Sequence, residues 1–385
     1  MNPVLAKLAP VRARVAAWFE EHGTYPLKLF AITRAGYLLA SFVGMTLIPG
    51  LFYHPEGRQR FLQPYPALDG LCRWDCGWFV IIARDGYSTA ENAKVFPLLP
   101  LLGWAFEKFL GIHHLITFLV VPNLCALASY YVLYRLFREL SDEEAARWGL
   151  AAFVAYPFAF YQAAAYPESM MTLASALGIW LAMRGRHIWA GVAVGLGTLA
   201  RHLTIFAGAG LVAAQIHQRG LHPRKLLLHP AILGLIVPWL FVGVFAWHLQ
   251  TRVGDPLAFW NARTIGWGDM VWWGVQDMFR YASFADRPEW FIYMGFALWP
   301  LAGTVALFTR KKWVELAAFA AVLMLMITTR GAVALGRYSA SVWPAFLPVG
   351  IWLAKRPELQ TPVLVMSAVL QGLFFFLFSH QWRIL

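Results

Sequence analysis

The chain has 385 residues, of which 59% are hydrophobic and 14% charged, and its mean hydropathy is +0.55. This apolar content exceeds what the core of a soluble protein of this length needs, and so excludes an ordinary soluble protein. The formal net charge of +12 would suggest nucleic-acid binding in a soluble protein, but in a membrane protein the informative quantity is the distribution of Lys and Arg, which reports orientation.

Apolar stretches of about 17 to 25 residues recur along the chain, and each is long enough to cross a bilayer as a helix. The sequence therefore predicts an all-α fold, a polytopic transmembrane helix bundle of about 11 spans in one integral membrane domain, 1–385. Two of these spans are expected from a hairpin of short helices over 188–217. The others are expected at 28–50, 113–137, 146–164, 167–183, 226–248, 290–309, 313–329, 333–354 and 361–379.

The segment 1–27 precedes these spans. Its residues 4–23 mix apolar and basic side chains at near-helical spacing, which predicts a helix on the cytoplasmic membrane surface. Lysine and arginine concentrate here and in five short loops, so these parts are assigned to the inside. The loops 51–112 and 251–289 then lie outside, and 96–111 is expected to form a helix at the outer interface. We expect a multi-pass protein of a bacterial inner membrane whose active site faces the periplasm.

One charged passage stands out in the first outer loop, "RWDCGWFVIIARDGYS" at 73–88. Apolar residues recur in it at spacings of three and four, which predicts a short amphipathic helix that ends at Gly86. Asp75 lies in the first turn, where the helix dipole favours an ionised carboxylate that can accept a proton from a hydroxyl group. The alternative is that Asp75 only starts the helix, with Trp74 and Trp78 as interfacial anchors.

Charged residues within the later spans are further candidates. Arg201 and His202 interrupt the hairpin at "ARHLT", and Arg337 lies beside Tyr338 in "LGRYSASVWPAF". An arginine at membrane depth is costly unless it faces a cavity and meets an anion, so both arginines are functional candidates. The alternative is an internal ion pair with a carboxylate such as Glu168. That residue, in "YPES", suits a helix start as well as it suits a functional site.

Cysteines and histidines predict neither a metal site nor a cofactor. Cys72 and Cys76 are four residues apart, and the sequence leaves open whether they are free or paired. His113, His114 and His202 lack the spacing of zinc ligands. No metal and no cofactor are therefore expected.

Two arginines facing an outward cavity, together with one exposed carboxylate, suit a definite reaction. A lipid-linked sugar phosphate carries its own leaving group, so transfer needs only a base for the acceptor hydroxyl and cations for the departing phosphate. A transporter or flippase of a lipid-linked or anionic solute is the main alternative, because it also uses intramembrane arginines and broken helices. A lipid-dependent acyl or phospho transferase is a second alternative. Repeated halves, which would favour the transporter, are not detected in the sequence.

Several motifs occur in an order that resembles a known family. They are "RWDCGWFVIIARDGY", "VFPLLPLL", "AYPES", "ARHLT", "GDPLAFW" and "LGRYSASVWPAF". From about residue 30 onward the chain resembles the mannosyltransferases of the PIG-V type, and more closely their bacterial relatives, within the GT-C superfamily of integral membrane glycosyltransferases. The resemblance implies a polyprenyl-phosphate sugar donor, commonly of mannose. It also implies an aspartate in the first outer loop that acts as general base with inversion at the anomeric carbon.

The resulting prediction is an inverting, metal-independent glycosyltransferase. Asp75 is expected to deprotonate the acceptor hydroxyl, and Arg201 and Arg337 to hold the lipid phosphate. The remaining substrate-binding residues are expected on the acceptor side (Arg73, Glu168 and Arg263), in an aromatic wall against the sugar (Trp74 and Trp78) and next to the two arginines (His202 and Tyr338). The expected partners are the polyprenyl-phosphate sugar donor, a lipid or glycan acceptor and membrane lipids.

Overall fold

A computed structural model describes residues 23–51, 60–267, 288–328 and 335–382. Within these ranges the regular structure consists of helices alone, as the sequence predicts. The predicted surface helix at 4–23 falls almost wholly outside the described residues, as do 52–59 and 268–287 of the two predicted outer loops.

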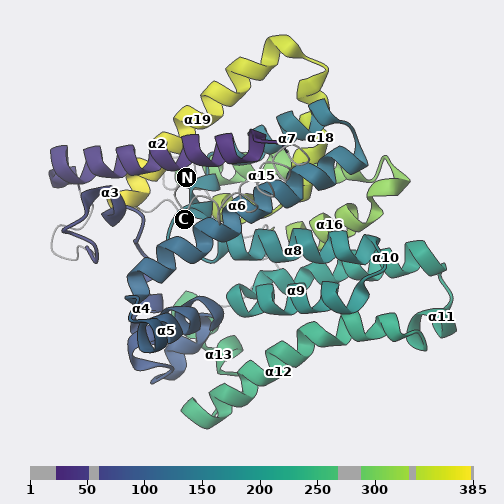
Figure 1. Ribbon diagram of the computed structural model, residues 1–385, viewed down its shortest axis with the longest axis horizontal. Helices are drawn as coiled ribbons and strands as arrows, with labels where there is room; N and C mark the ends of the chain where they lie inside the picture. The colour runs from purple at the N-terminus through teal and green to yellow at the C-terminus, as the bar shows by residue number, and fades with distance from the viewer. Residues whose placement is uncertain (1–22, 52–59, 268–287, 329–334, 383–385) are drawn as a thin grey trace, which may run out of the picture.

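The long helices lie side by side with their axes roughly along one direction (Figure 1). They are α2 (Tyr25–Leu47), α6 (His114–Leu140), α7 (Glu143–Ala155), α8 (Glu168–Met183), α9 (His187–Ala200), α10 (Gly208–Arg219), α12 (Leu233–Val253), α15 (Pro288–Leu307), α16 (Val314–Thr328) and α19 (Pro357–Ser379). Among the residues that the structure describes, four segments are long and apolar enough to cross a membrane, namely Tyr25–Leu47, His114–Leu140, Pro230–Val253 and Pro357–Ser379. Their exposed Leu, Ile, Val and Trp side chains suit contact with lipid.

Shorter helices gather at one end of the bundle, on the left in Figure 1. They are α3 (Pro66–Asp69), α4 (Cys76–Asp85), α5 (Leu98–Leu110) and α13 (Ala258–Trp267). The first three come from the predicted first outer loop. Helix α4 is the predicted amphipathic helix and ends at Gly86, whose φ of 69° a side chain would disfavour.

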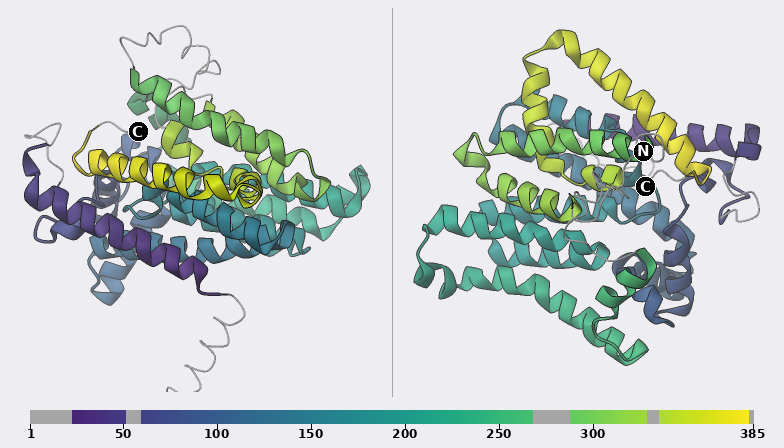
Figure 2. Two further views of the ribbon diagram at one scale, coloured as in Figure 1. Left: turned by 90° about the horizontal axis from the view of Figure 1, so that it is seen from above. Right: turned by 180° about the vertical axis from the view of Figure 1, so that it is seen from behind.

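The basic turns between the long helices meet at the opposite end. Trp313 donates to the carbonyl of Leu140, which joins the α15–α16 turn to the α6–α7 turn. The ring of His187, at the start of α9, meets Gln218 at the end of α10. Figure 2 shows the same separation from the other side. Within the described residues, the basic turns therefore lie at the end of the bundle opposite to the helices of the predicted first outer loop.

The predicted hairpin over 188–217 is confirmed. Helix α9 ends at Ala200, a short 3-10 helix follows over His202–Ala207, and α10 returns from Gly208. Arg201 lies at the break and is buried. The chain reverses there, so that the end of α10 contacts the start of α9.

Two predicted continuous spans are wrong. The helix expected over 146–164 stops at Ala155, because Pro157 follows and the residue before a proline favours an extended backbone; Tyr156 has φ −56° and ψ 136°. The helix expected over 333–354 is also broken, into α17 (Leu335–Ser339), a 3-10 turn at Trp343–Ala345 and α18 (Phe346–Ala354). The two breaks face each other, since the hydroxyls of Tyr156 and Ser339 are 2.6 Å apart. Irregular backbone is thus enclosed by protein.

Candidate active site

Asp75 is held in place by the backbone around it. It is the N-cap residue of α4, yet its carboxylate caps no backbone N–H of that helix. Trp74 before it has φ 54°, a left-handed conformation that non-glycine residues rarely adopt. The hydroxyl of Tyr166 accepts from the N–H of Asp75 at 3.0 Å and donates to the carbonyl of Arg73 at 2.9 Å. The Asp75 side chain is therefore available for interactions outside its own helix.

Three other charged residues meet Asp75 from distant parts of the chain. Nη1 of Arg337 lies 2.8 Å from Oδ2 of Asp75, and Nε of the same guanidinium donates to Oε1 of Glu168. Nη1 of Arg201 lies 2.7 Å from that same Oε1. We call Asp75, Glu168, Arg201 and Arg337 the open cluster. The internal ion pairs that the sequence left as an alternative do form.

These ion pairs leave several buried polar atoms without a partner. Among the described residues, no hydrogen bond reaches Oε2 of Glu168, Nε of Arg201, Nη2 of Arg337 or the hydroxyl of Ser169. Buried polar groups are normally paired, so unpaired ones call for an explanation such as a bound ligand. The two donor nitrogens suit an anion, and the carboxylate oxygen and the hydroxyl suit a polar, hydroxyl-rich molecule.

Exposure separates the two carboxylates. The Glu168 side chain is 1% exposed and lies between two guanidinium groups, whereas the Asp75 side chain is 25% exposed. Within the described part of the chain, Asp75 receives a side-chain hydrogen bond on Oδ2 alone. Glu168 is thus suited to fix the arginines, and Asp75 to meet an incoming molecule.

Aromatic rings support both arginines. The Arg337 guanidinium carbon lies 4.5 Å from the ring centre of Tyr166 and 5.0 Å from that of Tyr161, and Arg201 lies 5.0 Å from Tyr338. Ring faces attract such cations and hold the guanidinium planes in place. Sequence reasoning did not single out Tyr161 and Tyr166, although Tyr166 stands in the quoted "AYPES" motif.

Arg73 belongs to a second group of charges. It is fully buried, and Nη2 lies 3.1 Å from Oδ2 of Asp69 while Nε donates to the carbonyl of Ser379 at 2.7 Å. Arg60 also pairs with Oδ2 of Asp69 at 2.7 Å, and the N–H of Leu62 donates to Oδ1. We call Asp69, Arg60 and Arg73 the closed cluster. It ties the α3–α4 segment to the end of α19.

The remaining predicted residues lie around the open cluster or outside the described side chains. One face of the Trp78 ring is covered by Nζ of Lys94, 3.9 Å from the ring centre. The His202 ring lies 5.7 Å from that of Phe96. Arg263 is in α13, but its side chain falls outside the described residues. The structure thus brings Asp75, Glu168, Arg201, Arg337 and Tyr338 together, and places Arg73 in the closed cluster.

Cys72 and Cys76 form a disulfide immediately before and after the Arg73–Asp75 turn. Their Cα atoms are 5.4 Å apart, and both side chains are fully buried. The pairing that the sequence left open is thus present, and it encloses the turn that presents Asp75.

The open cluster is electrically balanced. Two arginines contribute +2 and two carboxylates −2, so its formal charge is zero when both carboxylates are ionised. If Asp75 takes up a proton, the charge becomes +1 and Arg337 loses its counter-charge at Nη1. The formal charge of the cluster therefore depends on whether Asp75 carries a proton.

Of three comparisons with known proteins, only the comparison with solved structures finds similar proteins. No protein-family model matches the chain, and no curated protein matches its sequence. Among solved structures, the oligosaccharyltransferase of Archaeoglobus fulgidus in complex with Zn and sulfate aligns with a TM-score of 0.51 at 13% identity, over 90% of this chain and 53% of that one. The same enzyme tethered to an acceptor peptide containing the NVT sequon aligns with a TM-score of 0.50 at 14% identity, over 95% of this chain and 56% of that one. The chain thus spans about half the length of these structures, and over that part it shares their helical fold.

Proposed function

We propose that the chain is an inverting glycosyltransferase that moves a sugar from a polyprenyl-phosphate donor to an acceptor hydroxyl at the outer face of the membrane. The fold shared with an oligosaccharyltransferase supports membrane glycosyl transfer as the class. The motif resemblance supports a PIG-V-like enzyme and mannose as the sugar. The acceptor is proposed to be a lipid or a glycan.

The observation that carries this proposal is the combination of open donors and an accessible carboxylate in one cluster. Nε of Arg201 and Nη2 of Arg337 are buried and lack a hydrogen-bond partner within the described residues. They would donate to the phosphate of the donor. The partly exposed carboxylate of Asp75 accepts a hydrogen bond from Nη1 of the Arg337 guanidinium, next to the unpaired Nη2.

The reaction follows from this arrangement. The acceptor oxygen attacks the anomeric carbon, the bond from that carbon to the phosphate oxygen breaks, and the acceptor proton passes to Asp75. The phosphodiester with one negative charge becomes a phosphomonoester with up to two. At the same time the open cluster changes from zero to +1, because Asp75 is neutralised. The cluster thus gains positive charge when the leaving group gains negative charge, which is differential stabilisation of the transition state.

Other side chains take supporting roles in this proposal. Glu168 holds both arginines, and Tyr338 and His202 lie on the Arg201 side. Trp74 and Trp78 would flank the sugar, and Arg263 the acceptor. Because Arg73 is in the closed cluster, we assign it a structural role, that of tying the α3–α4 segment to the end of α19.

We further propose about 11 spans in a bacterial inner membrane, with the open cluster on the periplasmic side. The gathering of basic turns at the end opposite to α4 and α5 supports this orientation. The Cys72–Cys76 disulfide supports it as well, because disulfides persist in oxidising compartments.

The test is transfer of label by the purified protein. Wild-type protein and Asp75→Ala are incubated with radiolabelled polyprenyl-phosphate mannose and a lipid extract, and the products are separated by chromatography. Label in a new species with wild-type protein alone supports the transferase. Movement of donor across liposomes without any new covalent product would instead establish the transporter.

A further inference from the structure

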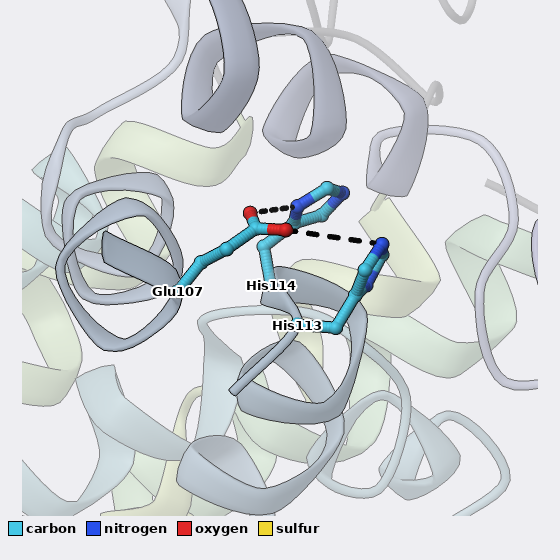
Figure 3. A group of neighbouring side chains, drawn as sticks. All are labelled: Glu107, His113 and His114. Atoms are coloured by element: carbon cyan, nitrogen blue, oxygen red, sulfur yellow. Dashed lines mark hydrogen bonds and ion pairs between the residues drawn. The ribbon is translucent and has the colours of Figure 1, made fainter. Parts of the chain in front are cut away.

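A second group of polar side chains lies at the turn between α5 and α6. Gly111 has φ 68° and reverses the chain after α5. Glu107 on the last turn of α5 therefore faces His113 and His114 at the start of α6 (Figure 3). The group belongs to neither the open nor the closed cluster, and no residue of it takes part in the proposed reaction.

The three side chains converge on a small volume. Nδ1 of His114 lies 2.6 Å from Oε2 of Glu107, and Nε2 of His113 lies 4.0 Å from Oε1. The two imidazole rings are 4.2 Å apart between their centres. One ligand atom from each residue lies within 4.8 Å of the others.

These distances suit a transition-metal ion. Zinc binds imidazole nitrogens and carboxylate oxygens at about 2.0 to 2.2 Å with tetrahedral angles, which separates neighbouring ligand atoms by about 3.3 Å. The observed separations bracket that value, so small side-chain rotations suffice. His114 is 10% exposed and fixed by the packing of α5 on α6, whereas His113 and Glu107 are 53% and 42% exposed. An ion can therefore enter from solvent and keep a water as its fourth ligand.

We propose that Glu107, His113 and His114 form a binding site for one Zn²⁺ ion per chain. The spacing of the histidines did not predict this site, because its third ligand, Glu107, comes next to them only through the turn at Gly111.

Binding changes two hydrogen bonds. The ion replaces the proton between His114 and Glu107. Coordination through Nε2 of His113 moves the ring proton to Nδ1, so the hydrogen bond that this atom accepts from the N–H of Leu115, 3.3 Å long, is lost. The ion would have only three protein ligands, and its binding would break the hydrogen bond from Leu115 to His113. We therefore expect a dissociation constant in the micromolar range, weaker than that of a closed four-ligand site.

The ion would clamp α5 to α6. Gly103 of α5 already packs closely against His114 and Phe118, since a Cβ there would lie 2.4 Å from the Phe118 ring. Helix α5 in turn packs against α4, which carries Asp75 at its start. Bound Zn²⁺ would thus stabilise the helix packing next to the open cluster without contacting any residue of that cluster.

The experiment uses the full-length, tag-free protein in detergent after treatment with a chelator. Zn²⁺ is titrated and followed by calorimetry and by the midpoint of thermal unfolding. We expect one ion per chain and a midpoint that rises with Zn²⁺ concentration. Glu107→Gln and His113→Ala, which alter exposed side chains, should each weaken binding at least tenfold.

A matched control is His217→Gln. His217 pairs with Glu315 at 2.8 Å and has a similar exposure, but no third ligand joins that pair among the described residues. This variant should bind Zn²⁺ as wild-type protein does. The proposal is overturned if Zn²⁺ does not bind at hundreds of micromolar, or if Glu107→Gln and His113→Ala bind as tightly as wild-type protein. Both readouts are independent of transfer activity.

Discussion

Two groups of buried arginines and carboxylates lie near the start of α4, and they differ in what remains unpaired. In the closed cluster, Asp69 accepts from two arginines and from the N–H of Leu62, and Arg73 also donates to the carbonyl of Ser379. In the open cluster, four charges pair with one another and still leave buried nitrogen and oxygen atoms without hydrogen bonds inside the described structure. The first group is complete as a structural unit, and the second is not.

This difference provides a criterion for telling charges that are satisfied within a membrane protein from charges that can still bind a ligand. Each group contains an arginine in an apolar part of the sequence, where burying a charge is costly. Neighbouring sequence does not separate them, because Arg73 and Asp75 stand two residues apart. What separates them is the balance of donors and acceptors.

Asp75→Asn should lower the transfer rate about 10³-fold, within the range of about 10² to 10⁴ expected for loss of a general base. An asparagine keeps the size and can still accept from Arg337. The unfolding midpoint should therefore change little. Initial rates measure the transfer, and a thermal scan of the same preparation measures the unfolding midpoint. A large fall in the midpoint would mean that Asp75 has a structural role, like Asp69.

Asp69→Asn is the counterpart in the closed cluster. It leaves Arg73 buried without its counter-charge, so the free energy of unfolding should fall by about 3 to 5 kcal/mol. The rate per folded molecule should stay within a few-fold of wild type. Denaturant titration and active-site-normalised rates check the two halves of this prediction. A selective loss of rate with unchanged stability would contradict it.

Arg337→Lys retains the charge but loses the planar fork that contacts Glu168 and Asp75 together. We expect a loss of about 10² in rate, comparable to removal of one donor to a developing anion. Arg73→Lys is the control, and should reduce stability rather than rate. If the two variants behave alike, the distinction between the clusters is wrong.

Replacing Cys72 and Cys76 together by serine should have the smallest effect. The bridge closes a loop of only a few residues, so its removal should reduce the free energy of unfolding by about 2 kcal/mol or less. Wild-type protein should show the same shift when reductant is added, and the serine variant should show none. An equal response of both proteins to reductant would mean that the bridge does not form.

Much of the fold could be predicted from local sequence. Hydropathy gave the helix bundle, Gly86 marked the end of α4, and "ARHLT" marked the break in the hairpin. The two broken spans were missed because Pro157 and Pro344 lie within apolar runs, where hydropathy outweighs the backbone constraint of a single proline.

The site was predicted less completely than the fold. Asp75, Arg201 and Arg337 could be selected because each is a charge in an apolar context. The pairing of Asp75 with Arg337, and the support from Tyr166, depend on segments more than 90 residues apart in sequence. The membership of Arg73 in the closed cluster was equally invisible, since its partner Ser379 lies 306 residues away.

The decisive measurement is equilibrium binding of polyprenyl phosphate, the proposed leaving group, to wild-type protein and to Asp75→Asn. The asparagine is neutral, as Asp75 is after it has taken the proton, and it leaves the open cluster at +1. We predict that Asp75→Asn binds polyprenyl phosphate at least as tightly as wild type while its transfer rate is lost. If binding and transfer are lost together, or if both are retained, Asp75 is not the base of a cluster that holds the departing phosphate.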